Sequence, residues 1–201
     1  MDLDGLKNEI EGIDIYLLDQ ILKGRYHEKD AILDVGCGNG RNLKWFYTNN
    51  FTIYGVDLNS KRLEKAKENY TNQKSNFSIQ NIKTLSFEKN TFDHIICNAV
   101  LHFAESKADF MVMVKELIRV LQPNGTLFIR TASKESLENK IKHISNGVYK
   151  LPDKTNRFLI TRELLQELQT TFNLSLIEKY KFVNVDNLRC MATIVLKKVK
   201  E

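Results

Sequence analysis

The chain has few cysteines, no long apolar run and no low-complexity tract among its 201 residues. Its three cysteines cannot all pair, and Cys37 and Cys97 lie in apolar stretches, so we expect reduced packing residues. No segment approaches the roughly 18 apolar residues of a membrane-spanning helix, and the first residues are acidic, unlike a signal peptide. No histidine–cysteine cluster has zinc-like spacing. These absences predict a cytoplasmic protein with no bound metal and no membrane contact.

The length suits one domain over residues 1–201. We expect an N-terminal helical segment over residues 1–30 and an inserted segment over residues 132–160. The formal net charge of +5 arises wholly in the last third of the chain. That excess indicates either a surface for an anionic partner or a lysine-rich, solvated C-terminal end.

The most informative segment is Ala31–Arg41, AILDVGCGNGR, an apolar run and an acid followed by three glycines at alternate positions. The apolar run predicts a buried strand of a parallel sheet. Gly36, Gly38 and Gly40 turn the chain sharply and remove the Cβ atoms that would keep a ligand off the backbone. Asn42–Tyr47 can then start a helix. A strand, a glycine turn and a helix are typical of the nucleotide-cofactor corner of a doubly wound α/β sheet.

The spacing of the glycines separates two classes of cofactor. A dinucleotide fingerprint needs G-x-G-x-x-G, but its sixth position is Arg41 counted from Gly36 and Leu43 counted from Gly38. An acid just before the turn would disfavour a pyrophosphate and favour a cationic cofactor without phosphate. The string D-x-G-x-G-x-G resembles motif I of the class I S-adenosylmethionine-dependent methyltransferases. This resemblance assigns to the cofactor site Asp34, Gly36, Cys37, Gly38 and Gly40.

A second apolar strand, Thr52–Asp57, ends in an acid about 20 residues after Gly36. A carboxylate there can accept hydrogen bonds from both hydroxyls of a ribose. Asp57 could instead only cap the next helix, a role for which Ser60 is better placed. We therefore predict that Asp57 binds the cofactor ribose, with Leu58 beside it.

Leu85–Asp93 resembles the family phrase L-P-F-x-x-x-x-F-D, with serine in place of the usual proline. Counting back, the resemblance places Asn81 at the adenine amino group and Ile82 beside the ring. Most members have aspartate there, but an asparagine can also accept from an amino group. An ordinary loop asparagine is the alternative. The residues after the fourth strand, Phe92–Cys97, meet the methionine half of the cofactor in this family, which implies a role for Asn98.

The resemblance continues through a helix at Lys107–Leu121 and a fifth strand at Thr126–Thr131, so it covers residues 31–131. It implies an α/β, Rossmann-like doubly wound seven-stranded sheet with helices on both faces. The implied strand order is 3-2-1-4-5-7-6, with the last strand antiparallel. The last two strands are expected at Ser175–Val183 and Arg189–Val199.

A helix predicted at Ile13–Leu22 precedes the sheet. In the resembling family such a helix lies over the cofactor, which implies contacts from Tyr16 and Arg25. A tyrosine in this position is more often a core residue, and Arg25 is better placed because a guanidinium can bind a carboxylate through two hydrogen bonds. After the fifth strand the resemblance weakens, and a helix capped by Thr161 follows the insertion. An insertion there emerges at the carboxyl edge of the sheet, where ligands bind. We predict a substrate lid with possible lining residues His143, Tyr149 and Arg157.

Three arginines are expected on that rim: Arg130, Arg157 and Arg189. They would favour an anionic or strongly polar substrate, unless they pair with lid acids such as Asp153. His102, just after the fourth strand, is the best candidate for a general base. An acceptor that is already anionic would need no base. Cys97 lies inside an apolar strand and is not expected to act as a nucleophile.

The segment Asn98–Leu101 lacks the N/D-P-P-Y phrase common in methyltransferases of DNA bases, and no added RNA-binding module is present. The chain resembles the tellurite- and thiopurine-type methyltransferases, which share its glycine turn. We predict S-adenosylmethionine-dependent methyl transfer to a small, polar or anionic acceptor by in-line displacement, with S-adenosylhomocysteine as product. Alternatives are an RNA or protein methyltransferase that uses the basic final third, and a non-catalytic S-adenosylmethionine-binding regulatory protein. Nucleic acid is possible as a partner but not favoured.

Overall fold

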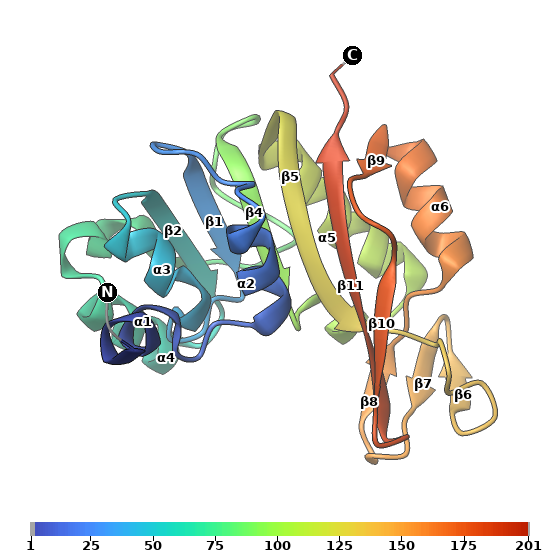
Figure 1. Cartoon of the computed structure of the whole chain (residues 1–201). Coiled ribbons are helices and arrows are strands. Elements are labelled where there is room, and N and C mark those ends of the chain that lie inside the picture. The colour runs from blue at the N-terminus through green and yellow to red at the C-terminus, as the bar shows by residue number, and fades with distance from the viewer. Residues whose placement is uncertain (1–2, 201) are drawn as a thin grey trace.

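The structure is a computed structural model that describes residues 3–200. A mixed sheet forms its centre, in the order β10-β11-β5-β4-β1-β2-β3 (Figure 1). Neighbouring strands from β3 to β5 are parallel, and β11 runs antiparallel to β5. The strands of this sheet are β1 (Ala31–Val35), β2 (Thr52–Asp57), β3 (Phe77–Ile79), β4 (Phe92–Asn98), β5 (Leu121–Ala132), β9 (Leu174–Leu176), β10 (Lys181–Val185) and β11 (Arg189–Lys198).

The predicted strand order 3-2-1-4-5-7-6 is confirmed, and β11 is the strand numbered 7 in that order. The predicted sixth strand consists of two pieces, because β9 and β10 pair separately with β11. Between them lies Glu178, whose carboxylate turns toward cationic side chains of the N-terminal segment. The predicted fifth strand is longer than expected, since β5 already begins at Leu121 and includes the turn residues before Thr126.

Helices cover both faces of the sheet because alternate residues of each strand point to opposite sides. Ile32 packs with α2 (Ile15–Leu22), α3 (Lys44–Thr48) and α4 (Ser60–Asn69). Its neighbour Leu33 packs on the other face with α5 (Lys107–Val120) and α6 (Arg162–Thr171). A further helix, α1 (Leu3–Ile10), contacts α3. Short 3-10 turns are η1 (Arg41–Leu43), η2 (Thr71–Asn76) and η3 (Leu101–Phe103).

Side-chain caps fix the starts of the longer helices. Thr161 caps α6 as predicted, by accepting a hydrogen bond from the backbone N–H of Leu164. The cap of α4 is Asn59 rather than Ser60, because the asparagine oxygen accepts from the backbone N–H of Arg62. Asp57 is therefore free of the capping role at this helix.

The segment after β5 folds as a small antiparallel sheet of β6 (Lys142–Ser145), β7 (Val148–Lys150) and β8 (Asn156–Phe158). Figure 1 shows it beside the β10–β11 hairpin, beyond the end of the central strands. A separate apolar cluster, which includes Ala132, Leu151 and Cys190, packs this small sheet against β5 and β11. Across residues 3–200, no helix is long and apolar enough to cross a membrane.

Candidate functional site

The glycine turn after β1 is held by close backbone packing. Gly36 has φ +74°, and a Cβ added there would lie 2.2 Å from Val100 Cγ2. Gly38 has φ +56°, and its N–H donates a 2.8 Å hydrogen bond to Asp57 Oδ2. The other oxygen, Asp57 Oδ1, accepts from the N–H of Asn59 at 2.7 Å. The ends of β1 and β2 are thus joined by the carboxylate that we expect to bind a ribose.

Gly40 has a different reason to be glycine. Its φ is +82°, and an added Cβ would lie 2.5 Å from Tyr70 Cε2. The Tyr70 hydroxyl donates to the Gly40 carbonyl at 2.6 Å. Gly40 therefore fits the turn to the side chain of Tyr70, a packing role that the sequence motif alone does not distinguish from ligand contact.

Three cavities meet at the carboxyl ends of the strands. The first, the glycine cleft, lies beside Gly36, Cys37 and Gly38. The second, the apolar slot, has a volume of about 250 Å³ and lies beside Asp57 and Ile82. The third, the arginine cavity, has a volume of about 440 Å³ and lies beside the β6–β8 sheet. Arg62 and Ala99 border all three, so the cavities adjoin one another. Ala99 has φ +62°, an uncommon conformation for a residue with a Cβ.

Unpartnered polar atoms mark the same place. Within the part of the chain that the structure describes, the buried side-chain nitrogens and oxygens without a hydrogen-bond partner all lie at the carboxyl ends of β1, β4 and β5 or in the turn after β4. They are Asp34 Oδ2, Asn98 Nδ2, His102 Nδ1, Arg130 Nε and Thr131 Oγ1. Buried polar atoms normally have partners, and an exception calls for a cause such as an absent ligand or water. Three of these residues, Asn98, His102 and Arg130, border the adjoining cavities, and their grouping there indicates a ligand-binding site.

The residues present fit an adenosyl cofactor with a cationic centre. The glycine turn leaves room for close approach to the backbone, and Asp57 and Leu58 border the apolar slot. Asp34 is buried behind the turn and does not border the cavities given above. Burial raises its pKa to about 7, with the Asp57 charge adding to the rise and Arg41 opposing it. A nearby cation would favour its charged form.

The two cysteines near the site are suited to packing. Cys37 is buried beside the glycine cleft, and its Sγ lies 3.7 Å from the Gly38 carbonyl oxygen. Burial raises the pKa of both Cys37 and Cys97 above the usual thiol range. A thiol that stays protonated is a poor nucleophile.

His102 lies in η3 and borders the arginine cavity. Only 8% of the residue is exposed, and its Nδ1 has no partner. Burial lowers its pKa to about 4, and the charges of Arg157 and Arg189 contribute to the lowering. At neutral pH the imidazole is therefore uncharged and can accept a hydrogen bond or a proton.

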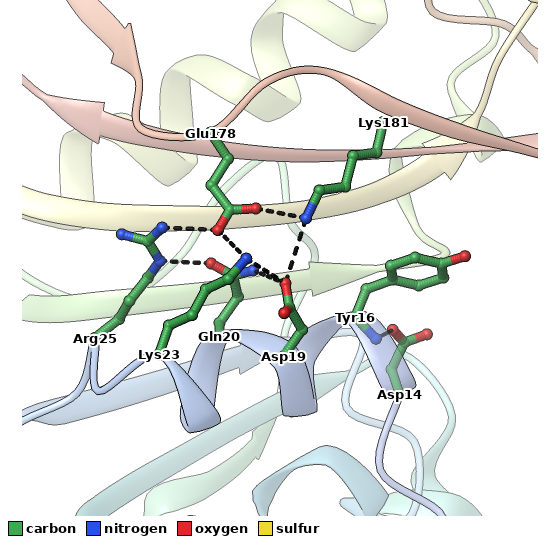
Figure 2. A network of polar contacts seen from close by, with 8 residues as sticks. All are labelled: Asp14, Tyr16, Asp19, Gln20, Lys23, Arg25, Glu178 and Lys181. Atoms are coloured by element: carbon green, nitrogen blue, oxygen red, sulfur yellow. Dashed lines mark hydrogen bonds and ion pairs between the residues drawn. The ribbon is translucent and has the colours of Figure 1, made fainter.

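Two predicted cofactor contacts from the N-terminal helix lie elsewhere. Arg25 pairs with Glu178 at 2.7 Å and donates to Gln20, as Figure 2 shows. It borders a separate cavity at the amino ends of β1 and β4, with Asp30 and His94. Arg25 therefore lies apart from the three cavities where we expect the cofactor, because the chain after α2 runs back to the start of β1.

Tyr16 lies beneath Arg130, whose guanidinium carbon is 4.7 Å from the ring centroid. The ring does not border the three cavities described above. Its neighbour Asp14 does, and Asp14 forms an ion pair with Arg130. The helix α2 thus meets the site through an N-cap carboxylate, a residue that sequence reasoning missed although Asp is a typical cap before an apolar helix.

Asn81, predicted to meet the adenine amino group, does not border the apolar slot. Asn81 is exposed, and its Oδ1 accepts a 3.0 Å hydrogen bond from the N–H of Lys83. The apolar slot is bordered instead by its neighbours Gln80 and Ile82. Gln80 Oε1 accepts from the N–H of Ser86, so the residue that replaces the usual proline helps to hold this side chain. Asn98 borders both the glycine cleft and the arginine cavity.

The three predicted rim arginines do converge on the arginine cavity, but they differ in their partners. Arg130 is engaged by Asp14, whereas no ion pair of Arg157 or Arg189 occurs within residues 3–200. Asp153 borders the cavity and is hydrogen-bonded to the N–H and hydroxyl of Thr155 rather than ion-paired with an arginine. Of the predicted lid residues, His143 and Tyr149 contact each other outside this cavity, and only Arg157 borders it.

Comparisons with known proteins agree with this geometry. Residues 33–129 match the family described as a methyltransferase domain. Over 122 residues the chain is 30% identical to a ubiquinone biosynthesis O-methyltransferase of Coxiella burnetii, covering 59% of this chain and 49% of that protein. The chain thus spans about half the length of the curated relatives it matches.

Two solved structures extend the likeness to most of the chain. An S-adenosylmethionine-dependent methyltransferase from Methanosarcina mazei has a TM-score of 0.74 at 21% identity, covering 90% of this chain and 98% of that one. The 1,6-didemethyltoxoflavin-N1-methyltransferase of Burkholderia thailandensis, solved with its substrate and S-adenosylhomocysteine, has a TM-score of 0.70 at 16% identity. It covers 98% of this chain and 86% of that one.

The strand order and the likeness to these solved structures show the Rossmann-like fold of the methyltransferases. The glycine turn and Asp57 lie at the carboxyl edge of its parallel strands. Residues 33–129, which match the methyltransferase-domain family, include this corner and end within β5.

Proposed function

We propose that this chain is an S-adenosylmethionine-dependent methyltransferase that acts on a small-molecule acceptor. The single observation that carries the proposal is the grouping of unpartnered buried polar atoms at the ends of β1, β4 and β5, around a turn shaped for an adenosyl cofactor. In a chain that no longer bound a ligand here, we would expect apolar or hydrogen-bonded side chains at these positions.

In this proposal the cofactor lies along the glycine cleft and the apolar slot. Asp57 accepts hydrogen bonds from the ribose hydroxyls, while Leu58 and Ile82 border the adenine. Asp34, which does not border the cavities, contributes through its charge to the binding of a cationic centre. Asn98 offers its unpartnered amide N–H toward the amino-acid end of the cofactor.

The acceptor occupies the arginine cavity. Its volume of about 440 Å³ is in the range of small-molecule sites, and Leu151, Asp153, Thr155 and Arg157 of the segment after β5 border it. When bound, the cofactor supplies an electrophilic methyl group whose bond to sulfur breaks as the bond to an acceptor oxygen or nitrogen forms. The chain's contribution is to orient the acceptor and exclude water, which can supply about 7–11 kcal/mol of the barrier reduction.

His102 is placed to assist an acceptor that carries a proton. Its unpartnered Nδ1 can accept a hydrogen bond from a hydroxyl or amine and take the proton that the acceptor loses. A pKa of about 4 makes it a weak base at neutral pH, so orientation of the acceptor is its larger role.

Binding of S-adenosylhomocysteine to the purified chain tests the cofactor half of the proposal. Asp57→Ala should weaken the affinity by about 10-fold or more, because two hydrogen bonds to a carboxylate are lost. Glu167→Gln is the control, since Glu167 lies on α6, pairs with Lys107 and borders none of the three cavities. The measurement is isothermal titration calorimetry, and a change of less than twofold in Asp57→Ala would contradict the ribose assignment.

Turnover tests the methyl-transfer half. Release of S-adenosylhomocysteine should be measured with a panel of small hydroxyl, amine and carboxylate acceptors. Cofactor binding without turnover on any of them would favour the regulatory alternative over an enzyme.

A further inference from the structure

Two arginines in the arginine cavity form no ion pair within residues 3–200. Arg157 comes from β8 of the small sheet and Arg189 from the start of β11, so two segments far apart in sequence bring them to one cavity. Arg157 NH1 donates only to the neighbouring Asn156 carbonyl, and no ion pair of either arginine is found in the described part of the chain. Arg130, the third predicted member, is already paired with Asp14.

The charge of the whole cavity is unbalanced in the same direction. Five arginines border it, Arg41, Arg62, Arg130, Arg157 and Arg189, against the two carboxylates Asp14 and Asp153. Two titratable groups already respond to this field. Burial would raise the pKa of Asp153, but hydrogen bonds from Thr155 and the charges of Arg189 and Arg157 hold it below the usual range. The same two arginines add to the effect of burial in lowering the pKa of His102.

The cavity also has an apolar side. The guanidinium carbon of Arg157 lies 4.8 Å from the centroid of the Phe103 ring, which borders both this cavity and the apolar slot. Phe103 is 60% exposed, so its ring is accessible from this cavity. Leu151, Val185 and Met191 complete this lining.

We infer that the acceptor is a small organic anion, a carboxylate on a flat apolar body, with the carboxylate bound by Arg157 and Arg189 and the body lying against Phe103. This inference rests on the proposed function and narrows its acceptor. The planar guanidinium matches the geometry of a carboxylate better than a point charge would. Because Phe103 also borders the apolar slot, an acceptor held in this way extends from the two arginines toward the cofactor.

The methylated atom is then a hydroxyl or amine at the end of the acceptor away from the carboxylate. A bond forms from that oxygen or nitrogen to the methyl carbon, the carbon–sulfur bond breaks, and its electron pair stays on the sulfur of S-adenosylhomocysteine. The proton of the acceptor passes to His102 or to water. The carboxylate serves to anchor the acceptor and is unchanged by the reaction.

Two probes of equal shape test the inference: 2-naphthoate and its neutral analogue 2-naphthamide. Binding is measured by calorimetry with S-adenosylhomocysteine at saturation. We expect 2-naphthoate to bind about 10-fold more tightly than the amide, because charge-assisted bonds to arginine are stronger than neutral ones. In the double variant Arg157→Gln, Arg189→Gln the preference should vanish, with the affinity for the amide and for S-adenosylhomocysteine unchanged within twofold. Lys150→Gln, at the exposed last residue of β7, is the control for removal of a charge near the cavity and should keep the preference.

The results separate this inference from the proposed function. Absence of S-adenosylhomocysteine binding to the unmodified chain would count against the proposed function itself. Cofactor binding together with equal affinity for the two probes, no detectable binding of 2-naphthoate, or a preference that survives in the double variant would overturn the inference alone. Thermal unfolding of each variant confirms that the fold is intact.

Discussion

At the scale of single residues, the glycine turn shows how a backbone angle and a close contact act together. Gly24 and Gly36 both have positive φ, at +65° and +74°. A Cβ at Gly24 would meet nothing within 4 Å, whereas at Gly36 it would lie 2.2 Å from Val100. The two positions therefore separate the cost of an unfavourable φ from the cost of a steric clash.

We predict that Gly24→Ala lowers the free energy of unfolding by about 1–2 kcal/mol, the cost of a left-handed conformation with a Cβ. Gly36→Ala should lower the free energy of unfolding by about 1–3 kcal/mol more than Gly24→Ala, because Val100 must move to admit the methyl group. Urea unfolding followed by circular dichroism measures both. Equal losses in the two variants would show that the contact with Val100 is relieved without cost.

His102 offers a second test at this scale. We predict that its imidazole titrates near pH 4, because burial and the two arginines disfavour the charged form. In the double variant Arg157→Gln, Arg189→Gln the pKa should rise but stay below the usual 6.5, since burial is the larger cause. Nitrogen-15 spectra of histidine side chains measure this, with His102→Gln for assignment. A titration near 6.5 in the unmodified chain would contradict the buried environment.

The positions of site residues were predictable only where the motif fixes both spacing and direction. Asp57 was expected at the carboxyl edge of the parallel strands and borders the apolar slot there, while its role toward a ribose stays a prediction. Arg25 could not, since its guanidinium is directed by Glu178, which lies 153 residues further along the chain. Gln80 and Asn81 are neighbours in a loop, where a shift of one residue changes which side chain faces the slot.

At the scale of elements, the helix α2 is fixed at both ends. Its N-cap Asp14 pairs with Arg130 of β5, and near its other end Lys23 and Arg25 pair with Glu178 (Figure 2). Lys181 of β10 also contacts Glu178, at 2.8 Å. The helix is therefore held against the sheet on the site side and on the far side.

We predict that Glu178→Gln lowers the free energy of unfolding at pH 7 by about 1–2 kcal/mol, because it leaves three neighbouring cations with less compensation. Glu64→Gln, in an exposed pair with Lys67, should cost less than about 0.5 kcal/mol. Burial alone would raise the pKa of Glu178, but hydrogen bonds from Lys181, Lys23 and Arg25 outweigh it and hold the pKa well below its usual value. Its stabilisation is thus present above the unfolded value near 4.5 and is lost as pH falls through the lower folded value. The difference in unfolding free energy between the unmodified chain and Glu178→Gln should accordingly shrink in acid. A difference that is constant from pH 7 to 3 would contradict the lowered pKa of Glu178.

Most of the elements were predictable because their apolar periodicity is clear. The helix at Lys107–Leu121 and the strands around the glycine turn fall within a residue or two of their predicted limits. The β6–β8 sheet was not predictable, because its strands are three or four residues long and β6 is exposed throughout. Such strands show no alternation of buried and exposed residues.

At the scale of the whole molecule, stability depends on histidines that are buried without charge. His94 is 7% exposed and lies between Asp30 Oδ2, at 2.9 Å, and Thr126 Oγ1, at 2.7 Å. Burial lowers its pKa below 6.5, although Asp30 and Asp93 oppose the effect. As pH falls below 6.5, the unfolded chain therefore binds a proton that the folded chain does not.

We predict that the stability conferred by His94 decreases as pH falls from 6.5, with a slope of up to about 1.4 kcal/mol per pH unit. Asp34 acts in the opposite direction, since its raised pKa lets the folded chain bind a proton first. The test is therefore the difference in unfolding free energy between the unmodified chain and His94→Gln, measured in urea from pH 7.5 to 5. That difference should narrow in acid, while the effect of His143→Gln, on the exposed strand β6, should not change. A constant difference for His94→Gln would mean that the buried imidazole takes up its proton without cost.

The two halves of the site come from different stretches of the chain. The turn after β1 and the acid after β2 precede residue 60, whereas most of the roof over the neighbouring cavity is built from residues 151–157 and 185–191. If the proposed function holds, an engineer could exchange that roof for the corresponding loops of a relative and so change the acceptor while the cofactor half stays unaltered. Arg62 and Ala99 border both halves, and such a chimera would have to preserve them.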